Sequence, residues 1–203
     1  MPITVMKSEK KAVLGGTFDP VHMGHINLFH SVSELTPITT LYVIPNYVSN
    51  FKRERKTAPF DDRMAMLNLA ILDYADLYPF DDLNIVVSDI EGRKKGVSYT
   101  CDTIRFLFDE IEDEGKVNFI IGDDLLEGLP FWHESEYLMT HVRFWCFVRD
   151  YASRPSLDGF DVHYIESEQT VASSTAVRDG DMSLVSDSVR EYIEENGLYK
   201  AEG

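Results

Sequence analysis

The sequence contains little cysteine and no long apolar run. Its 203 residues include two cysteines, Cys101 and Cys146, which are far apart and outside the spacings typical of metal sites. A secreted, disulfide-bonded protein is therefore disfavoured, and a reduced, cytoplasmic protein is expected. The opening residues, MPITVMKSEKK, lack the apolar stretch of a signal peptide, and no window approaches the length of a transmembrane helix.

Positive charge is also scarce. Lysine and arginine number 19 against 35 aspartates and glutamates, which gives a formal net charge of −16. Such a field repels the phosphate backbone of nucleic acids, so neither a nucleic acid nor a membrane is an expected partner. Phosphate groups can still bind in a local pocket that outweighs the global sign. The dense positive run is Lys52–Lys56.

The order of apolar runs predicts one α/β domain over residues 1–203. Strands are predicted at KAVLGG, TTLYVIP, LNIVVSD, KVNFIIG, RFWCFV and DVHYIE, and segments with helical character lie between them. This alternation is typical of a mostly parallel, twisted sheet with helices on both faces, as in Rossmann-like folds. In such sheets, ligands bind beyond the carboxyl ends of the strands.

Helices are predicted between these strands and at the end of the sequence. INLFHSVSEL and Thr100–Ile111 each read as a helix, and two helices follow the last strand, with Gly197 as the C-cap of the second. A further helix is predicted to bury one face, made of Phe60, Met64, Leu67 and Ile71.

The stretch LGGTFDPVHMGHINLFH carries the strongest functional pattern. Gly15 and Gly16 fall where the first strand should end, so bare backbone N–H groups can approach a ligand. His22 and His25 share one face at the start of the next helix, a place that favours anions, and Gly24 leaves room between them. The pattern predicts a phosphate site in which two imidazoles stabilise charge on a phosphoryl group.

The two histidines have two alternative interpretations, as zinc ligands or as unconnected residues. Zinc ligation is disfavoured because no third ligand follows in a usual pattern and no glutamate adjoins, as it does in H-E-x-x-H. Unconnected surface or core histidines remain an alternative. The glycines match neither the G-x-G-x-x-G fingerprint nor a Walker A loop.

A second candidate phosphate site lies near the end of the sequence. Ser173, Ser174 and Thr175 precede a predicted helix, so their hydroxyls and its first N–H groups can hold a phosphate. Arg178 follows one turn later, and its fork of N–H donors suits phosphate oxygens. A plain helix cap beside a surface arginine is the alternative.

GGTFDPVHMGH resembles the signature of the adenylyltransferases that act on nicotinate or nicotinamide mononucleotide, within the HxGH nucleotidyltransferase superfamily. Three further segments resemble that family in the same order along the chain: SYTCDTIRFL, FIIGDDLLEGLPFWH and SSTAVR. The ending YIEENGLY also matches. The resemblance runs from about Lys11 to Tyr199, and four motifs in order are far more specific than any one of them.

The resemblance implies a Rossmann-like nucleotidyltransferase fold whose C-terminal helices, residues 173–199, complete an ATP site. It implies adenylyl transfer from ATP to nicotinate mononucleotide, which gives deamido-NAD and pyrophosphate in NAD biosynthesis, with Mg²⁺ bridging the ATP phosphates. The expected catalytic residues are His22, His25 and Arg178. The expected ATP contacts are Gly15, Gly16, Thr17, Phe18, Gly24, Ser174 and Thr175.

The resemblance also implies a mononucleotide site. Trp132 offers a flat face for the pyridine ring, with a buried structural tryptophan as the alternative. Thr100 and Asp124 match positions that contact the mononucleotide. Lys52 matches a basic phosphate contact, although a solvated lysine is a real competitor. Arg149 is the candidate for the family's arginine after the fifth strand.

The chain departs from the family pattern at several positions. Members often carry a histidine just before the basic residue matched by Lys52, where this chain has Phe51. Asp150 replaces a proline, and Ala172 replaces an isoleucine. These changes bear on substrate preference more than on reaction type. Asp19 is a candidate for a water-mediated contact to magnesium, or else a structural turn residue before Pro20.

Several functions remain open at this point. The same reaction on nicotinamide mononucleotide, a phosphopantetheine adenylyltransferase and a cytidylyltransferase for small phosphates share the HxGH chemistry. A non-catalytic nucleotide sensor and a metal-dependent hydrolase are alternatives of other classes. Trp132 and SYTCDT favour the pyridine nucleotide, but the choice between acid and amide depends on backbone groups near Thr100 and His133. The oligomeric state is open, and a homo-oligomer is one option.

Overall fold

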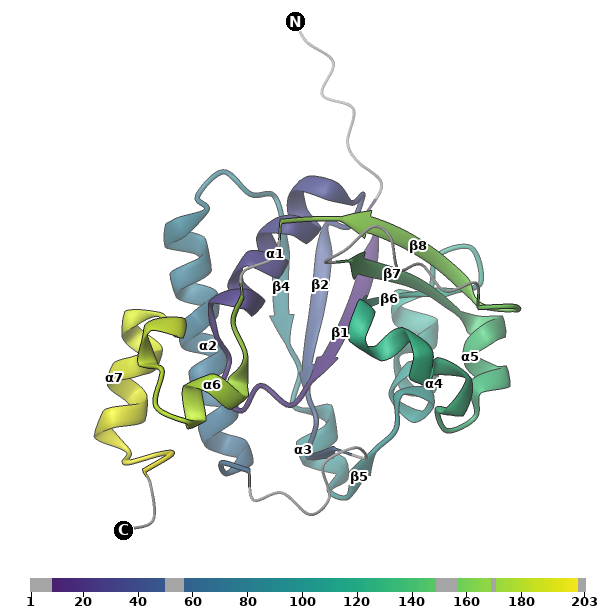
Figure 1. The fold of residues 1–203 in the computed structure, drawn as a ribbon. Helices are drawn as coiled ribbons and strands as arrows, with labels where there is room; N and C mark the ends of the chain where they lie inside the picture. Colours follow the sequence, from purple (N-terminus) through teal and green to yellow (C-terminus); the bar gives the residue numbers. More distant parts are fainter. Residues whose placement is uncertain (1–8, 50–56, 149–156, 169–170, 201–203) are drawn as a thin grey trace, which may run out of the picture.

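The core of the fold is one parallel sheet of six strands. The computed structural model describes residues 9–49, 57–148, 157–168 and 171–200 (Figure 1). The strands lie side by side in the order β4-β2-β1-β6-β7-β8, and every neighbouring pair is parallel. Their bounds are β1 (Lys11–Gly16), β2 (Thr40–Pro45), β4 (Asn84–Val87), β6 (Val117–Gly122), β7 (Val142–Val148) and β8 (Asp161–Glu166). The predicted α/β Rossmann-like fold is confirmed.

This strand order has one switch point. The chain first winds outward from β1 through β2 to β4, then returns to the other side of β1 and continues through β6 and β7 to β8. The connections on the two sides of β1 therefore leave a crevice above the carboxyl ends of β1 and β6. The loop after β1, which carries the two histidines, begins at that crevice.

Helices cover both faces of the sheet. Along β1, Ala12 and Leu14 belong to one apolar core and Val13 to the other, as the alternation of side chains along a strand requires. The first core is closed by α1 (Met23–Leu35), α2 (Phe60–Leu77), α6 (Ser174–Arg178) and α7 (Asp187–Glu195). The second is closed by α3 (Ile90–Lys94), α4 (Thr100–Ile111), the 3₁₀ helix η1 (Asp123–Phe131) and α5 (Ser135–His141).

Several short elements were not predicted from the sequence, among them β3 (Val48–Ser49), β5 (Val97–Ser98), η2 (Met182–Leu184) and α3 (Ile90–Lys94). β3 and β5 pair in a separate two-stranded sheet, and η2 lies between α6 and α7. Strands of two residues are too short to give a periodic signal. No helix in the described ranges has the length and apolar character needed to cross a membrane.

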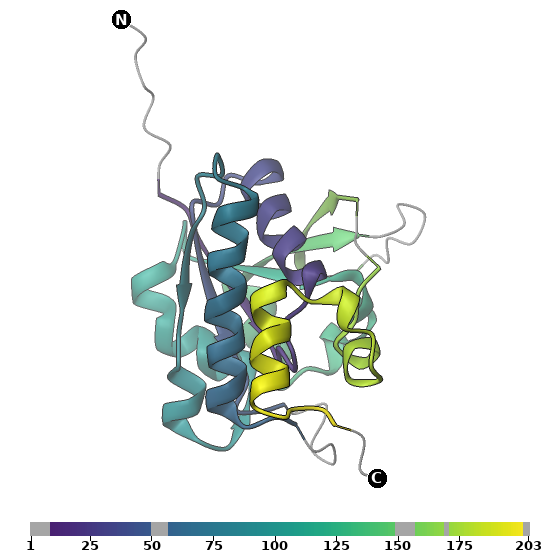
Figure 2. The same ribbon diagram turned by 90° about the vertical axis from the view of Figure 1, so that its left-hand side faces the viewer.

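The predicted buried face of α2 was partly wrong. Leu67 is buried, but Phe60, Met64 and Ile71 are only half-buried. The buried side chains are instead Arg63, Met66, Leu67, Ala70 and Tyr74. Because α2 packs against both α1 and α7, as Figure 2 shows, its covered face is turned toward those two helices. Arg63 is charged, so an apolar pattern could not identify it as part of that face.

The end of α7 differs by one residue from the prediction. Asn196 is the C-cap, and Gly197 follows it with a φ of 62°. Glycine tolerates this left-handed conformation without a steric penalty, so it turns the chain just after the cap.

Arg63 connects the loops after β1 and β2 with the segment before α2 through hydrogen bonds. It is 1% exposed, and its guanidinium donates hydrogen bonds to the carbonyls of Thr17 at 2.7 Å, Asn46 at 2.8 Å and Tyr47 at 3.2 Å. Its Nε donates to the carbonyl of Ala58 at 3.1 Å. One buried side chain thus satisfies backbone groups from the loops after β1 and β2 and from the segment before α2.

Replacing Arg63 with leucine should lower the free energy of unfolding by roughly 3 kcal/mol or more, because buried carbonyls lose their donors. Urea denaturation followed by circular dichroism measures this change. Arg190→Leu is the control, since Arg190 is a half-exposed partner of the exposed Asp187 on α7; its unfolding curve should match the wild type. Equal stability of Arg63→Leu and the wild type would contradict the role of Arg63.

Candidate active site

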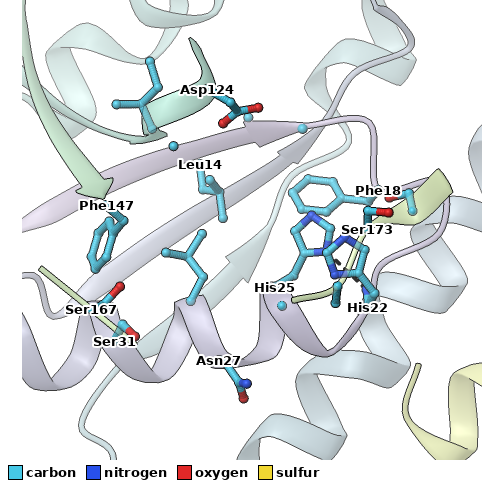
Figure 3. Close-up of a pocket in the computed structure, with 18 of the residues that line it drawn as sticks. Leu14, Phe18, His22, His25, Asn27, Ser31, Asp124, Phe147, Ser167 and Ser173 are labelled. Atoms are coloured by element: carbon cyan, nitrogen blue, oxygen red, sulfur yellow. Dashed lines mark hydrogen bonds between the residues drawn. The ribbon is translucent and has the colours of Figure 1, made fainter. Parts of the chain in front are cut away.

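A pocket of about 360 Å³ lies at the switch point of the sheet (Figure 3). Its walls come from the loop after β1 and the start of α1, from the end of β6, and from the start of α6. The expected residues that line it are Gly15, Gly16, Phe18, His22, Gly24, His25, Asp124, Ser174, Thr175 and Arg178. Segments more than 150 residues apart along the chain therefore meet in one cavity.

Backbone geometry at the start of α1 positions the two imidazoles. His22 is the N-cap, and the His25 N–H donates to its carbonyl at 2.8 Å. The His22 N–H in turn donates to Nδ1 of His25 at 3.2 Å. Because Nδ1 accepts this bond, the neutral His25 ring carries its proton on Nε2. The ring centroids lie 3.9 Å apart, and Figure 3 shows the two rings next to each other.

His22 is the neutral member of the site in the free protein. Its Nδ1 is buried and has no hydrogen-bond partner among the described residues. Burial, and next the charge of Arg178, lower the pKa of His22 from 6.5 to about 4. The imidazole is therefore uncharged near neutral pH. A buried nitrogen without a protein partner is suited to a ligand atom.

Gly24 is required by the His22 ring. A Cβ on Gly24 would lie 3.0 Å from Nδ1 and 3.1 Å from Cε1 of that ring, closer than almost all real contacts of a Cβ. A side chain at this position would therefore require the imidazole to shift by a few tenths of an ångström. The H-x-G-H spacing thus has a steric reason as well as a chemical one.

Helix α6 docks directly on the loop after β1. The Ser173 hydroxyl caps the helix by accepting from the Ala176 N–H at 3.1 Å. The Ser174 hydroxyl donates to the Pro20 carbonyl at 2.9 Å, and Nη1 of Arg178 donates to the Asp19 carbonyl. Nη2 of Arg178 donates to the Thr175 hydroxyl at 2.9 Å. These bonds hold the guanidinium on the same side of the pocket as the histidines.

A second, smaller cavity adjoins the first. It measures about 40 Å³ and is lined by Thr100 and by residues of β1, β2, β5 and α4. Gly15 lines both cavities, so the two meet at the end of β1. Trp132 lines neither of them. Its half-buried ring packs edge-on against Phe119, a wall of the smaller cavity, with 6.4 Å between ring centroids.

Not every expected site residue falls where the sequence placed it. Asp124 lines the larger pocket, although it was expected at the mononucleotide. Thr17 does not line that pocket, and its carbonyl is held by Arg63. Lys52 and Arg149 lie outside the described residues, as do Phe51 and Asp150.

Sequence reasoning missed the far wall of the larger pocket. That wall comes from α1, β7 and the segment after β8, and its residues include Asn27, Ser31, Phe147 and Ser167 (Figure 3). For Phe147 and Ser167, the position at the carboxyl ends of β7 and β8 was the available signal. No spacing in the sequence separates them from ordinary core or loop residues.

One group of metal-ligating side chains occurs in the part of the chain that the structure describes. Cys101, His133 and Glu134 place one potential ligand atom each within 4.8 Å of the others. Arg105 already donates two hydrogen bonds to the Glu134 carboxylate, so its charge is neutralised. In the larger pocket, the oxygen donors that suit magnesium are the carboxylates of Asp124 and Glu168.

Comparison with known proteins agrees with this geometry. The family model described as cytidylyltransferase-like matches residues 13–180. A probable nicotinate-nucleotide adenylyltransferase of Enterococcus faecalis is 31% identical, over 99% of this chain and 90% of the relative. A probable nicotinate-nucleotide adenylyltransferase of Geobacillus kaustophilus is 32% identical, over 95% and 87%.

A solved structure shares the fold. The Plasmodium falciparum nicotinic acid mononucleotide adenylyltransferase complexed with NaAD superposes with a TM-score of 0.76 at 19% identity, over 95% of this chain and 98% of that chain. Fold and pocket together define a nucleotidyltransferase of the cytidylyltransferase-like class. Within that class, the chain belongs to the nicotinate-nucleotide adenylyltransferase family.

The lowered pKa of His22 makes a prediction about acid stability. The folded protein resists protonation of this ring until about pH 4, whereas the unfolded chain takes up the proton near pH 6.5. The free energy of unfolding therefore falls as the pH drops through this window, and this ring accounts for about 3 kcal/mol of the loss at its lower end.

His22→Gln removes this titration, so its stability should depend less steeply on pH between 6.5 and 4.5. Urea unfolding of both proteins at several pH values in that window measures the difference. The carboxylates titrate in both proteins and cancel in the comparison. Parallel stability curves would show that His22 titrates normally in the folded state.

Proposed function

We propose that this protein transfers the adenylyl group of ATP to nicotinate mononucleotide, giving deamido-NAD and pyrophosphate. One observation carries the proposal: His22, His25 and Arg178 line a single pocket at the switch point of the sheet. Membership of the nicotinate-nucleotide adenylyltransferase family supplies the substrate class. The smaller cavity, which meets the pocket at Gly15, is proposed to receive part of the mononucleotide.

Positioning and neutralisation of charge account for the chemistry. The phosphate of the mononucleotide attacks the α-phosphorus of ATP, and the bond to the pyrophosphate breaks, with no covalent enzyme intermediate. Two cavities that share Gly15 can bring the attacking oxygen and the α-phosphate together. The glycine leaves its backbone N–H accessible to phosphate oxygens at the junction.

The histidines stabilise the charge that develops on the phosphates. The Nε2–H of His25 is a fixed donor because the His22 backbone holds the other ring nitrogen. The His22 ring is neutral in the free protein. A phosphate anion beside it raises its pKa, and the protonated ring then supplies a second donor. The N-terminus of α1, a helix of 13 residues, adds a partial positive charge at the same point.

The leaving pyrophosphate is assigned to α6. Arg178 offers a guanidinium at the pocket wall, and Ser174 and Thr175 offer hydroxyls beside it. Asp124 or Glu168 would hold a magnesium ion, which would neutralise charge on the phosphates. Asp19 is less suited to this role because it is 3% exposed and its carboxylate already accepts two hydrogen bonds.

The proposal places the protein in the cytoplasm, where ATP is abundant and thiols stay reduced. Cys101 and Cys146 are free and buried. Burial raises the pKa of Cys146 to about 12, so its thiol stays protonated and unreactive. Free thiols of this kind are typical of a reducing compartment.

Pyrophosphate release with a panel of acceptors tests the proposal. The panel is nicotinate mononucleotide, nicotinamide mononucleotide and phosphopantetheine with ATP, and glycerol 3-phosphate with CTP. We expect the highest kcat/KM with nicotinate mononucleotide. Faster turnover of another acceptor would assign the site to that substrate, and ATP binding without turnover of any acceptor would indicate a sensor.

His25→Ala should lower kcat by about a hundredfold or more, the scale of one lost preorganised donor, while the fold survives. Steady-state kinetics and a circular dichroism spectrum of the same preparation check both statements. His141→Ala is the matched control, because His141 ends α5 and lines neither cavity. A folded His25→Ala variant with wild-type turnover would remove His25 from the mechanism.

A further inference from the structure

A buried carboxylate lies directly behind Arg178. Asp19 is 3% exposed, in the loop between β1 and α1. Its Oδ1 accepts hydrogen bonds from the Ala58 N–H at 3.0 Å and from the Tyr199 hydroxyl at 2.8 Å. Its Oδ2 lies 3.6 Å from Nη1 of Arg178, and that same nitrogen donates to the Asp19 carbonyl. One aspartate thus contacts the guanidinium through both its side chain and its backbone.

The segment after α7 delivers Tyr199 to this carboxylate. Gly197 turns the chain, and Tyr199 itself has a left-handed φ of 57°. For a residue with a bulky side chain this conformation is unfavourable, and it persists where surrounding contacts determine it. Burial, and next the charge of Asp19, raise the pKa of Tyr199 far above its usual value. The hydroxyl therefore stays protonated and remains a donor to Asp19.

The geometry points to Tyr199 and Asp19 as positioning residues for Arg178: the Tyr199 hydroxyl orients the Asp19 carboxylate, which holds the guanidinium toward the phosphates. This inference rests on the proposed function of Arg178 as the residue that binds the ATP phosphates and the pyrophosphate. It gives the last described turn of the chain a role in phosphate binding, although Tyr199 lines neither cavity.

The two oxygens of the Asp19 carboxylate have different partners, and this difference explains how Tyr199 can affect Arg178. Two donors occupy Oδ1, so the carboxylate cannot rotate freely, and only Oδ2 faces the arginine. Without the tyrosine hydroxyl, the Ala58 N–H alone holds Oδ1, so the carboxylate turns more easily and can pair with the guanidinium through both oxygens. A guanidinium paired in this way has fewer N–H donors left for phosphate, so its affinity for phosphate is lower.

The chain contains a matched control for this tyrosine. Tyr192, on α7, donates its hydroxyl to Oδ1 of Asp62 on α2 at 2.9 Å. Like the pair of Tyr199 and Asp19, this pair joins the C-terminal segment to the body of the protein through one tyrosine–aspartate hydrogen bond. Asp62 lines neither cavity, and the carboxylate beside Arg178 is that of Asp19.

The experiment measures the affinities of Tyr199→Phe and Tyr192→Phe for ATP, inorganic pyrophosphate and nicotinate mononucleotide by titration calorimetry, and their kcat and KM. Tyr199→Phe should weaken ATP and pyrophosphate binding about fivefold or more, the scale of one lost hydrogen bond, and should lower kcat. Its affinity for nicotinate mononucleotide should not change. Tyr192→Phe should match the wild type in every binding measurement.

Two results would overturn the inference: unchanged pyrophosphate affinity in Tyr199→Phe, or equal losses in both variants, which would indicate a general role in holding the C-terminal segment. If Tyr199→Phe does not fold, Asp19→Asn tests the second step of the inference: it removes the charge that holds the guanidinium in place, so pyrophosphate affinity should again fall, and unchanged affinity would overturn the inference. Pyrophosphate binding can be measured without turnover. This test therefore still applies if nicotinate mononucleotide proves not to be the acceptor.

Discussion

The docking of α6 on the loop after β1 is the interaction on which the site depends. Hydrogen bonds from Ser174 to the Pro20 carbonyl and from Arg178 to the Asp19 carbonyl bring the third wall of the pocket to the two histidines. The sheet alone would present only the loop after β1 and the end of β6. The site is thus assembled by polar contacts between loops, on a scaffold that is held together by apolar packing.

Among its described residues, the pocket contains few groups that are positively charged in the free protein. In a chain of net charge −16, the pocket combines one guanidinium, the positive end of α1 and a histidine that stays neutral when free. Two protonated imidazoles beside Arg178 would repel one another and the arginine in a poorly solvated place. Leaving His22 uncharged avoids that repulsion until a phosphate anion arrives and stabilises the proton.

Much of the fold could be predicted from the sequence, because the strands of the sheet are apolar runs separated by helical patterns. His22, His25 and Arg178, which line the larger pocket, could also be named, since each belongs to a recognisable short pattern. The buried face of α2 could not be predicted, because its covered side includes the charged Arg63 and is shared between two neighbouring helices. The partnership of Asp19 with Tyr199 could not be predicted either, since it joins residues 180 positions apart and depends on where α7 packs.

The contacts of Asp19 also set an order of events during synthesis. The loop after β1 leaves the ribosome early, whereas its partners Arg178 and Tyr199 lie 159 and 180 positions further along the chain. Strands β1 to β7 all end by Val148, so they are synthesised before α6, which supplies the third wall of the pocket. A nascent chain therefore has its histidines in place but lacks the arginine, and nucleotide cannot stabilise the fold until translation is almost complete.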